Sequence, residues 1–243
     1  MEYYNNIQKD QKLSKKISNS GTLGTFKVFL FFALGILISG LMAFFYPFVF
    51  AYLIADSYQA YFISLAVFAV LYLLSSFLPT IGYVKQNSIL TGIGYFISAI
   101  SFGGLISVYT LFLDTSILAT ALLVTGGMFL IAGIIGVLFK GKLYKTIGIL
   151  SAGMIALMVL VLISFFFYEM TVLDWIISIL GVIIFTLWAA IDINRVVKKG
   201  ENLYFNNSNS EALYEAFVLY TDFASVFVYV LRLILILSQR NRN

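Results

Sequence analysis

The stretch WIISILGVIIFTLWAAID, residues 175–192, holds seventeen consecutive uncharged residues before an aspartate ends it. This length is close to the ~20 apolar residues that an α-helix needs to cross a hydrocarbon core of ~30 Å. Comparable apolar runs, separated by short polar breaks, occupy the chain from Phe26 onward. They predict seven membrane spans, at residues 26–54, 61–84, 89–113, 116–139, 143–167, 173–194 and 212–237.

The composition of the chain also indicates a membrane protein. Of its 243 residues, 61% are hydrophobic and 11% are charged, whereas a soluble domain carries about 25% charged residues. Lipid satisfies no backbone polar group, and the alternating pattern of barrel strands is absent, so the spans have to be helical. We therefore predict an all-α membrane protein, a seven-helix transmembrane bundle with no room for a separate soluble domain.

Cysteine and histidine are missing from the sequence. Their absence excludes disulfides, thiol nucleophiles, Cys/His zinc sites, haem on either residue and Ser-His-Asp triads. It also removes the usual pH sensor, so a response to pH near neutrality has to come from carboxylates. The net charge of +4 in so apolar a chain reflects loop lysines and membrane topology rather than nucleic-acid binding. We expect no nucleic-acid partner and no bound cofactor.

The distribution of basic residues predicts the orientation in the membrane. Residues 1–25 form a polar tail with four lysines, and more basic residues follow the second, fourth and sixth spans: Lys85, Lys140, Lys142, Lys145, Arg195, Lys198 and Lys199. The loops on the other side carry only acidic charges: Asp56, Asp114, Glu169 and Asp174. By the positive-inside rule the N-terminal tail is cytoplasmic, and residues 26–238 form the transmembrane domain of a cell-membrane protein.

The short basic end of the chain, residues 239–243, conflicts with this orientation. Seven full spans place Arg240 and Arg242 outside, against the positive-inside rule. Either the end violates the rule, or the last segment is partly re-entrant.

Small residues recur at the spacing of helix contacts. Gly35, Ser39 and Ala43 share one face of the first span, Ala132 and Gly136 share a face of the fourth, and two glycine pairs lie at 103–104 and 126–127. Such residues let helices approach closely, which predicts bundle packing, with a hinge or pore-lining role as the alternative. The two prolines, Pro47 and Pro79, lie inside spans, where we expect them to kink the helix.

Two aspartates inside the spans are the candidate functional residues. An aspartate at mid-span costs ~2.5–3.5 kcal/mol on insertion scales, so it needs a partner or a role. Asp192 ends the sixth span and Asp222 lies in the seventh, and these antiparallel neighbours are expected to bring the carboxylates to a similar depth. The simpler alternatives are a solvated charge at a helix end for Asp192 and a structural hydrogen bond for Asp222.

Other charges near the last span complete the set. Ser208 and Glu211 form a capping box that starts the last helix near residue 209, with Glu211 and Glu215 in a first stretch that projects into the cytoplasm. Arg232 follows Asp222 by ten residues. It is either a salt-bridge partner or a side chain that snorkels toward the far interface.

The residues around both aspartates resemble the motifs of the Bax inhibitor-1 family. The segment LYTDFASVF, residues 219–227, followed by Val230-Leu231-Arg232, resembles the closing motif Leu-Tyr-x-Asp-Phe-Ile-Asn-Leu-Phe and its Leu-Leu-Arg continuation. The segment AIDINRV, residues 190–196, resembles the second motif, an aspartate between an apolar helix and a short basic stretch. Ala224 and Ser225 depart from the Ile-Asn of the family.

The resemblance implies a central helix wrapped by two groups of three and a pH-sensitive calcium leak across the membrane. Asp192 and Asp222 would be the gate, the pH sensor and the site for Ca²⁺, which fits the preference of hard cations for oxygen ligands. An arginine after the second span braces the pair in the family. Lys85 is the nearest cation here, and a lysine holds a carboxylate as a point charge rather than as a planar fork.

Other functions fit the residues less well. An intramembrane aspartyl protease would resemble its family in a Gly-x-Gly-Asp motif, but residues 219–222 contain no glycine. The last span has no lysine for a retinal Schiff base. We therefore expect no enzyme activity. The alternative to the leak is a non-conducting regulator of membrane proteases, or of cell-death and stress machinery, acting through protein contacts.

Overall fold

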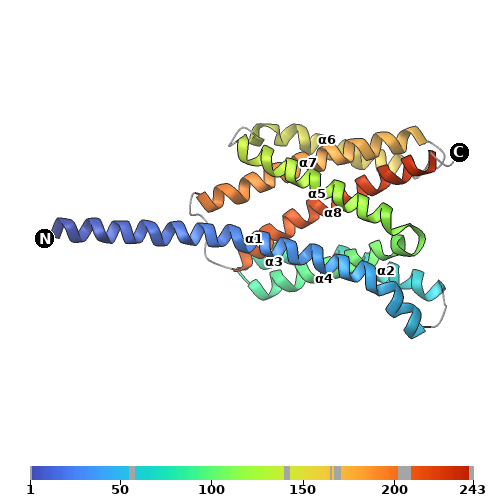
Figure 1. Cartoon of the computed structure of the whole chain (residues 1–243), viewed down its shortest axis with the longest axis horizontal. Coiled ribbons are helices and arrows are strands. Elements are labelled where there is room, and N and C mark those ends of the chain that lie inside the picture. Colours follow the sequence, from blue (N-terminus) through green and yellow to red (C-terminus); the bar gives the residue numbers. More distant parts are fainter. Residues whose placement is uncertain are drawn as a thin grey trace. The chain divides into compact units, whose positions relative to one another are not determined.

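The computed structural model describes residues 2–54, 58–139, 143–164, 166, 171–201 and 209–240. All regular structure in these ranges is helical (Figure 1): α1 (Glu2–Ile54), α2 (Tyr58–Ser75), α3 (Leu78–Val84), α4 (Ser88–Phe112), α5 (Thr115–Leu138), the 3-10 helix η1 (Leu143–Thr146), α6 (Ile147–Ser164), α7 (Thr171–Glu201) and α8 (Asn209–Arg240). Of the predicted positions, Asp56, Lys140, Lys142, Glu169, Ser208 and Arg242 lie outside the described residues.

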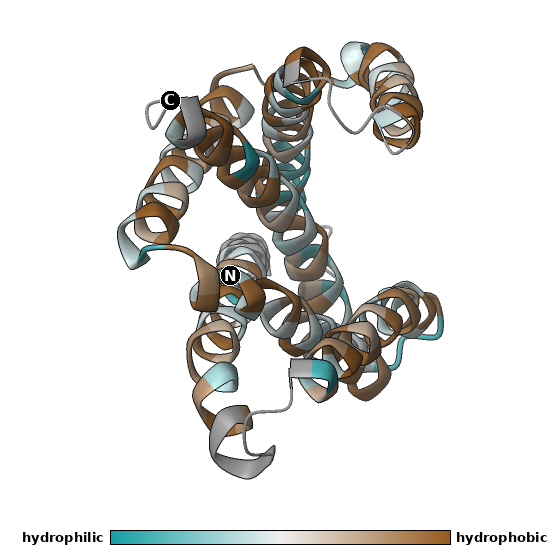
Figure 2. Cartoon of the chain, turned by 90° about the vertical axis from the view of Figure 1, so that its right-hand side faces the viewer, coloured by the Kyte–Doolittle hydropathy of each residue, from teal (hydrophilic) through white to brown (hydrophobic). Residues whose placement is uncertain are grey.

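Seven helical segments within the described ranges are long and apolar enough to cross a membrane: Thr22–Phe50, Gln59–Val84, Ser88–Phe112, Thr115–Leu138, Leu143–Ser164, Val172–Glu201 and Asn209–Ser238. The prediction of a seven-span, all-α membrane protein is confirmed. Apolar residues dominate the helices (Figure 2), and many large ones are exposed, such as Leu123 and Ile149 at 77% and 76%. Such surfaces suit a hydrocarbon environment rather than water.

The helix boundaries differ in detail from the predicted spans. α1 begins at Glu2, so it includes the polar stretch predicted as a tail, and Pro47 lies inside it. The second span consists of two helices, because α3 starts at Leu78 with Pro79 in its first turn, where the missing N–H of proline does least harm. α8 is one unbroken helix, which favours a full last span over a re-entrant one.

A tight turn connects α3 to α4. Gln86 adopts a left-handed backbone with φ of 53°. The next residue, Asn87, accepts hydrogen bonds at its Oδ1 from the backbone N–H groups of Ile89 and Leu90, both at 3.1 Å. Asn87 therefore caps the first turn of α4, where backbone donors have no partner inside the helix.

The chain divides into two compact units. Unit 1 comprises Met1–Val108 and Arg195–Phe217, and unit 2 comprises Tyr109–Asn194 and Val218–Asn243. Helices α7 and α8 contribute residues to both units. The C-terminal end of α7 and the N-terminal end of α8 belong to unit 1, and the rest of both helices belongs to unit 2.

In unit 1, α1 packs closely on α4 through the predicted small residues. The Ser39 hydroxyl donates to the Ala99 carbonyl at 2.8 Å, and a Cβ on Gly103 would lie 2.4 Å from the Ser39 carbonyl oxygen. The Tyr95 hydroxyl donates to the Phe31 carbonyl at 2.9 Å and occupies the space beside Gly35. The prediction of close packing on this face of α1 is confirmed.

In unit 2, glycines set two helix contacts. A Cβ on Gly136 of α5 would lie 2.6 Å from the Ala190 carbonyl oxygen of α7, and the Asn194 amide donates to the Gly136 carbonyl. The Tyr229 ring of α8 fills the space beside Gly181 of α7. Ala132, one turn before Gly136, is fully buried. In contrast, a Cβ on either glycine at 126–127 would meet no described atom within 4 Å, so that pair makes no close helix contact.

Candidate functional site

Both predicted aspartates are buried in unit 2. Asp192 on α7 is 4% exposed and Asp222 on α8 is 8% exposed. The simpler reading of Asp192, a solvated charge at the end of a helix, is therefore wrong. α7 continues for nine residues beyond Asp192 to Glu201, which explains why the aspartate is not at a helix end.

The contacts between α7 and α8 in unit 2 define how the two helices run against each other. Arg232 of α8 forms an ion pair with Asp174 in the first turn of α7. The Tyr229 ring stacks on Phe185 with ring centroids 5.6 Å apart. The helices are thus antiparallel. Asp192 follows Phe185 by seven residues, and Asp222 precedes Tyr229 by seven residues, a distance of about two turns on each helix.

The ion pair gives Arg232 a partner other than the two aspartates. Asp174 precedes Asp192 by eighteen residues, about 27 Å along α7. The side chains of Arg232 and Asp174 are 33% and 36% exposed. Arg232 therefore links the N-terminal end of α7 to α8.

Lys85, the other predicted cation, follows the last turn of α3 as its C-cap residue. It is exposed and belongs to unit 1, whereas both aspartates belong to unit 2. Its role beside the aspartates stays a prediction.

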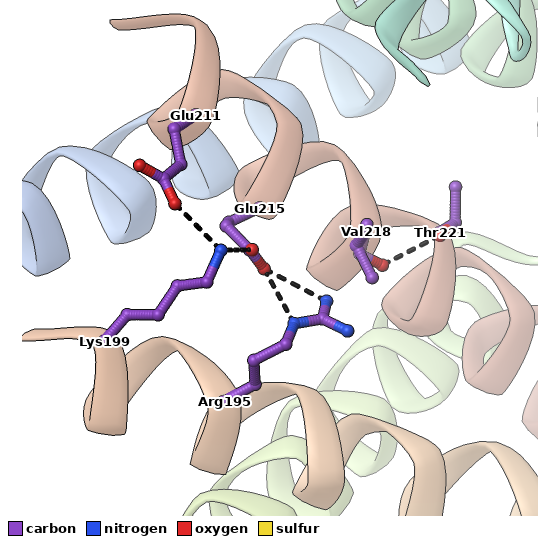
Figure 3. Close-up of polar contacts among 6 residues, drawn as sticks. All are labelled: Arg195, Lys199, Glu211, Glu215, Val218 and Thr221. Carbon is purple, nitrogen blue, oxygen red and sulfur yellow. Dashed lines mark hydrogen bonds and ion pairs between the residues drawn. The ribbon is translucent and has the colours of Figure 1, made fainter. Parts of the chain in front are cut away.

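A group of four charged residues in unit 1 joins α7 to α8 (Figure 3). We call it the ion network: Arg195 and Lys199 of α7 with Glu211 and Glu215 of α8. Arg195 contacts the Glu215 Oε2 through Nε at 3.1 Å and Nη2 at 3.0 Å. The Lys199 Nζ donates to the Glu215 Oε1 at 2.6 Å and to the Glu211 Oε1 at 2.9 Å. Two cations thus balance two carboxylates.

The carboxylates of the ion network are more deeply buried than its cations. The Glu215 side chain is 2% exposed, whereas those of Lys199 and Arg195 are 23% and 34% exposed. The Lys199 Nζ also lies 6.0 Å from the centroid of the Tyr83 ring, which stacks on Tyr214 at 4.5 Å. A buried carboxylate is tolerated when its oxygens are paired and hydrogen-bonded, as both Glu215 oxygens are.

The sequence predicts Glu211 and Glu215 in a stretch that projects into the cytoplasm, and this prediction does not include their pairing with α7. A signal for the pairing was present. The cations are four residues apart on α7 and the carboxylates are four residues apart on α8, so each pair lies on one helix face. Their signs also match the helix dipoles, because cations suit the C-terminal end of α7 and carboxylates suit the N-terminal end of α8.

The N-terminal end of α8 is held by further contacts in unit 1. α8 begins at Asn209, as the predicted capping box required, and Ser208 itself is not described. The Lys27 Nζ donates to the Asn209 Oδ1 at 2.9 Å, and the hydroxyls of Ser210 and Thr91 lie 2.8 Å apart. α8 is thus connected to α1 and to α4 beside the ion network.

The number of potential metal ligands near the aspartates limits how a cation could bind there. Among the residues that the structure describes, no group of three or more Asp, Glu, His or Cys side chains could hold a metal ion. Within the described part of the chain, Asp192 and Asp222 would therefore be the only carboxylate ligands for a cation bound between them. Ca²⁺ prefers six to eight oxygen ligands, so water or backbone carbonyls would have to supply the others.

Comparison with known proteins places the chain in a family. The profile of the family described as "Inhibitor of apoptosis-promoting Bax1" matches residues 24–242. A protein of Borreliella burgdorferi described as uncharacterized is 31% identical over 148 residues, which are 60% of this chain and 62% of that protein. The chain thus spans less than two thirds of that relative. Because the family profile covers nearly the whole chain, including both aspartates and the ion network, this multi-pass membrane protein belongs to the Bax inhibitor-1 family.

Proposed function

We propose that the protein is a pH-sensitive calcium leak in which Asp192 and Asp222 form the gate. The observation that carries the proposal is the burial of both aspartates on two antiparallel helices of a membrane protein. Charged residues within membrane spans are rare and commonly mark paths for ions or protons.

The contact between Phe185 and Tyr229 supports the pairing of the aspartates. In an antiparallel pair, a residue that follows a contact on one helix lies at the same height as the residue that precedes the contact by the same number of positions on the other. Two turns from this contact lead to Asp192 on α7 and to Asp222 on α8. Two turns also return to nearly the same helix face, so both aspartates are expected on the faces that meet.

Two carboxylates would make a weak site for calcium, as a leak requires. Ca²⁺ takes oxygen ligands, and tight sites use several carboxylates in one loop. A pair of aspartates can lower the barrier for a passing ion without trapping it. The partners of this activity are the lipid bilayer, calcium ions and protons, and no catalytic step is involved.

The pH sensitivity follows from the proximity of like charges. Two neighbouring carboxylates do not ionise together cheaply and share a proton. The singly protonated pair forms a strong hydrogen bond that ties α7 to α8, and this is the closed state. Loss of the proton introduces repulsion, and gain of a second removes the negative charge, so either change alters the closed state.

Calcium flux into proteoliposomes, measured with a trapped indicator dye at a series of pH values, tests the proposal. We expect flux through the wild type to vary between about pH 5 and 8, and Asp222→Asn to flatten that variation. Asp114→Asn is the matched control, because Asp114 is an exposed aspartate at the start of α5. A wild-type protein without flux would instead support a regulator that acts through protein contacts.

We further propose that the N-terminus is cytoplasmic in the cell membrane. The basic residues after the second, fourth and sixth spans support this orientation by the positive-inside rule. Single cysteines replacing Lys145 and Asp114 in the cysteine-free chain can be treated with a membrane-impermeant thiol reagent in intact cells. Labelling at 114 alone agrees with the orientation, and labelling at 145 alone reverses it.

A further inference from the structure

We infer that the ion network is a clamp between α7 and α8, with Glu215 as its positioning residue. The clamp holds the C-terminal end of α7 against the N-terminal end of α8. Its effect on ion flow rests on the proposed leak function: with the clamp intact, the closed state is favoured.

Glu215 is the centre of the network because it bridges two turns of α7. Its Oε2 receives both contacts from Arg195, and its Oε1 receives the shortest contact, the 2.6 Å hydrogen bond from Lys199. Lys199 in turn bridges Glu215 and Glu211, which lie one turn apart on α8. Replacing Glu215 removes the link to Arg195 and one of the two links of Lys199, whereas replacing Glu211 removes one link only.

The burial of its carboxylates distinguishes the network from surface ion pairs. Exposed pairs contribute little because water and salt screen them and because long side chains lose freedom. Glu215 is almost fully buried, and the Lys199 Nζ lies 6.0 Å from the centroid of the Tyr83 ring, which stacks on Tyr214. Separating the Glu215 carboxylate from its cations would leave an uncompensated buried charge, which is strongly destabilising, so the pairing holds the two helices together.

The helices of the clamp are also the helices of the aspartates. Asp192 precedes Arg195 by three residues and Lys199 by seven on α7, and Asp222 follows Glu215 by seven on α8. These spacings put the clamp residues and the aspartates on the same faces of two unbroken helices. When the clamp opens, the spacing of the aspartates is no longer constrained from this end of the helices.

A reversible cross-link tests the clamp within one protein. In the cysteine-free chain, Lys199→Cys with Glu215→Cys removes the clamp, and a short bifunctional methanethiosulfonate reagent reconnects the same positions. We expect calcium flux in proteoliposomes roughly tenfold above wild type before cross-linking, a factor within the range of coupling between contacting charges. We expect flux to return toward wild type after cross-linking and to rise again with reductant. The two single-cysteine variants, which cannot be bridged, are the controls.

A second pair of variants keeps the test independent of cysteine chemistry. Glu215→Gln should raise the flux, whereas Asp114→Asn, which removes the same charge from an exposed position before α5, should not. Equal flux in both variants would overturn the clamp as a control of the gate. The same conclusion would follow if cross-linking left the flux of the double-cysteine protein unchanged.

A distance measurement separates failure of the clamp from failure of the leak. Nitroxide labels on cysteines at Lys198 and Asn209 report the distance between the clamped ends of α7 and α8. Glu215→Gln should broaden and lengthen this distance whether or not the protein passes ions. An unchanged distribution of label distances would contradict the clamp itself. A changed distribution in a protein without calcium flux would contradict only the proposed leak.

Discussion

Helices α7 and α8 contact each other by different means in the two units. In unit 1 the contact is a charge network with two cations for two carboxylates, and both Glu215 oxygens have a cationic partner. In unit 2 the contacts include an aromatic ring on a glycine, a ring stack and one ion pair whose side chains are about one third exposed. Unit 2 also holds the two buried aspartates of the proposed gate, Asp192 and Asp222. Paired opposite charges fix the helices in unit 1, whereas in the proposed gate of unit 2 the helix position depends on the protonation of the two aspartates.

Removing the central carboxylate should produce the largest loss of stability. Glu215→Gln removes the carboxylate charge beside Arg195 and one of the two beside Lys199, and breaking a buried ion pair costs about 3 kcal/mol. Thermal unfolding followed by the fluorescence of the two tryptophans measures the effect. The control Asp114→Asn, at an exposed carboxylate, should change stability by less than about 0.5 kcal/mol. Similar losses in both variants would remove the distinction between the network and surface charge.

A methyl group added between α5 and α7 at Gly136 should cause the next largest loss of stability. A Cβ in Gly136→Ala would lie 2.6 Å from a backbone oxygen, which does not move as easily as a side chain, so we expect a loss of about 2 kcal/mol. Gly133→Ala is the matched control one turn earlier, where a Cβ meets no described atom within 4 Å. It should be neutral or stabilise by up to about 1 kcal/mol. A reversed order would show that α5 contacts α7 differently.

Enlarging the glycine under the Tyr229 ring should cost less. In Gly181→Ala the new methyl group would lie 2.5 Å from ring atoms, and a side chain can rotate to relieve the overlap, so about 1 kcal/mol is expected. Gly127→Ala supplies the same change in open space. Unfolding in graded detergent mixtures should resolve the pair, and equal stabilities would mean that ring packing contributes little to the α7–α8 contact in unit 2.

Breaking the exposed ion pair should have the smallest effect. Asp174 and Arg232 are each about one third exposed, so a double-mutant cycle of Asp174→Asn and Arg232→Gln should give a coupling of about 0.2–1 kcal/mol. Added salt should reduce it further. A coupling of Asp174 and Arg232 as large as the stability loss of Glu215→Gln would contradict the expected difference between the exposed ion pair and the ion network.

Much of the fold could be predicted from the sequence, because span length and apolar composition are read directly from it. The burial of Asp222 followed from its place within an apolar run, whereas Asp192 ends such a run, and the sequence left open a solvated position at a helix end. The open position of the glycine pair at 126–127 could not be predicted, since both faces of that helix are apolar and sequence does not tell lipid from protein. The ion network was missed because its pairing depends on how two helices align.

The unequal lengths of the helices have a consequence for the lipid around them. α6 has 18 residues and is about 27 Å long, whereas α8 has 32 residues and is about 48 Å long. A hydrocarbon layer of ~30 Å suits α6 but leaves α8 to tilt or to extend into the headgroup region. Longer acyl chains would draw more of α8, including its charged first turns, toward the hydrocarbon. Hydrophobic mismatch therefore acts more strongly on α8 than on α6. A change in bilayer thickness would change how far the charged first turns of α8 lie from the hydrocarbon.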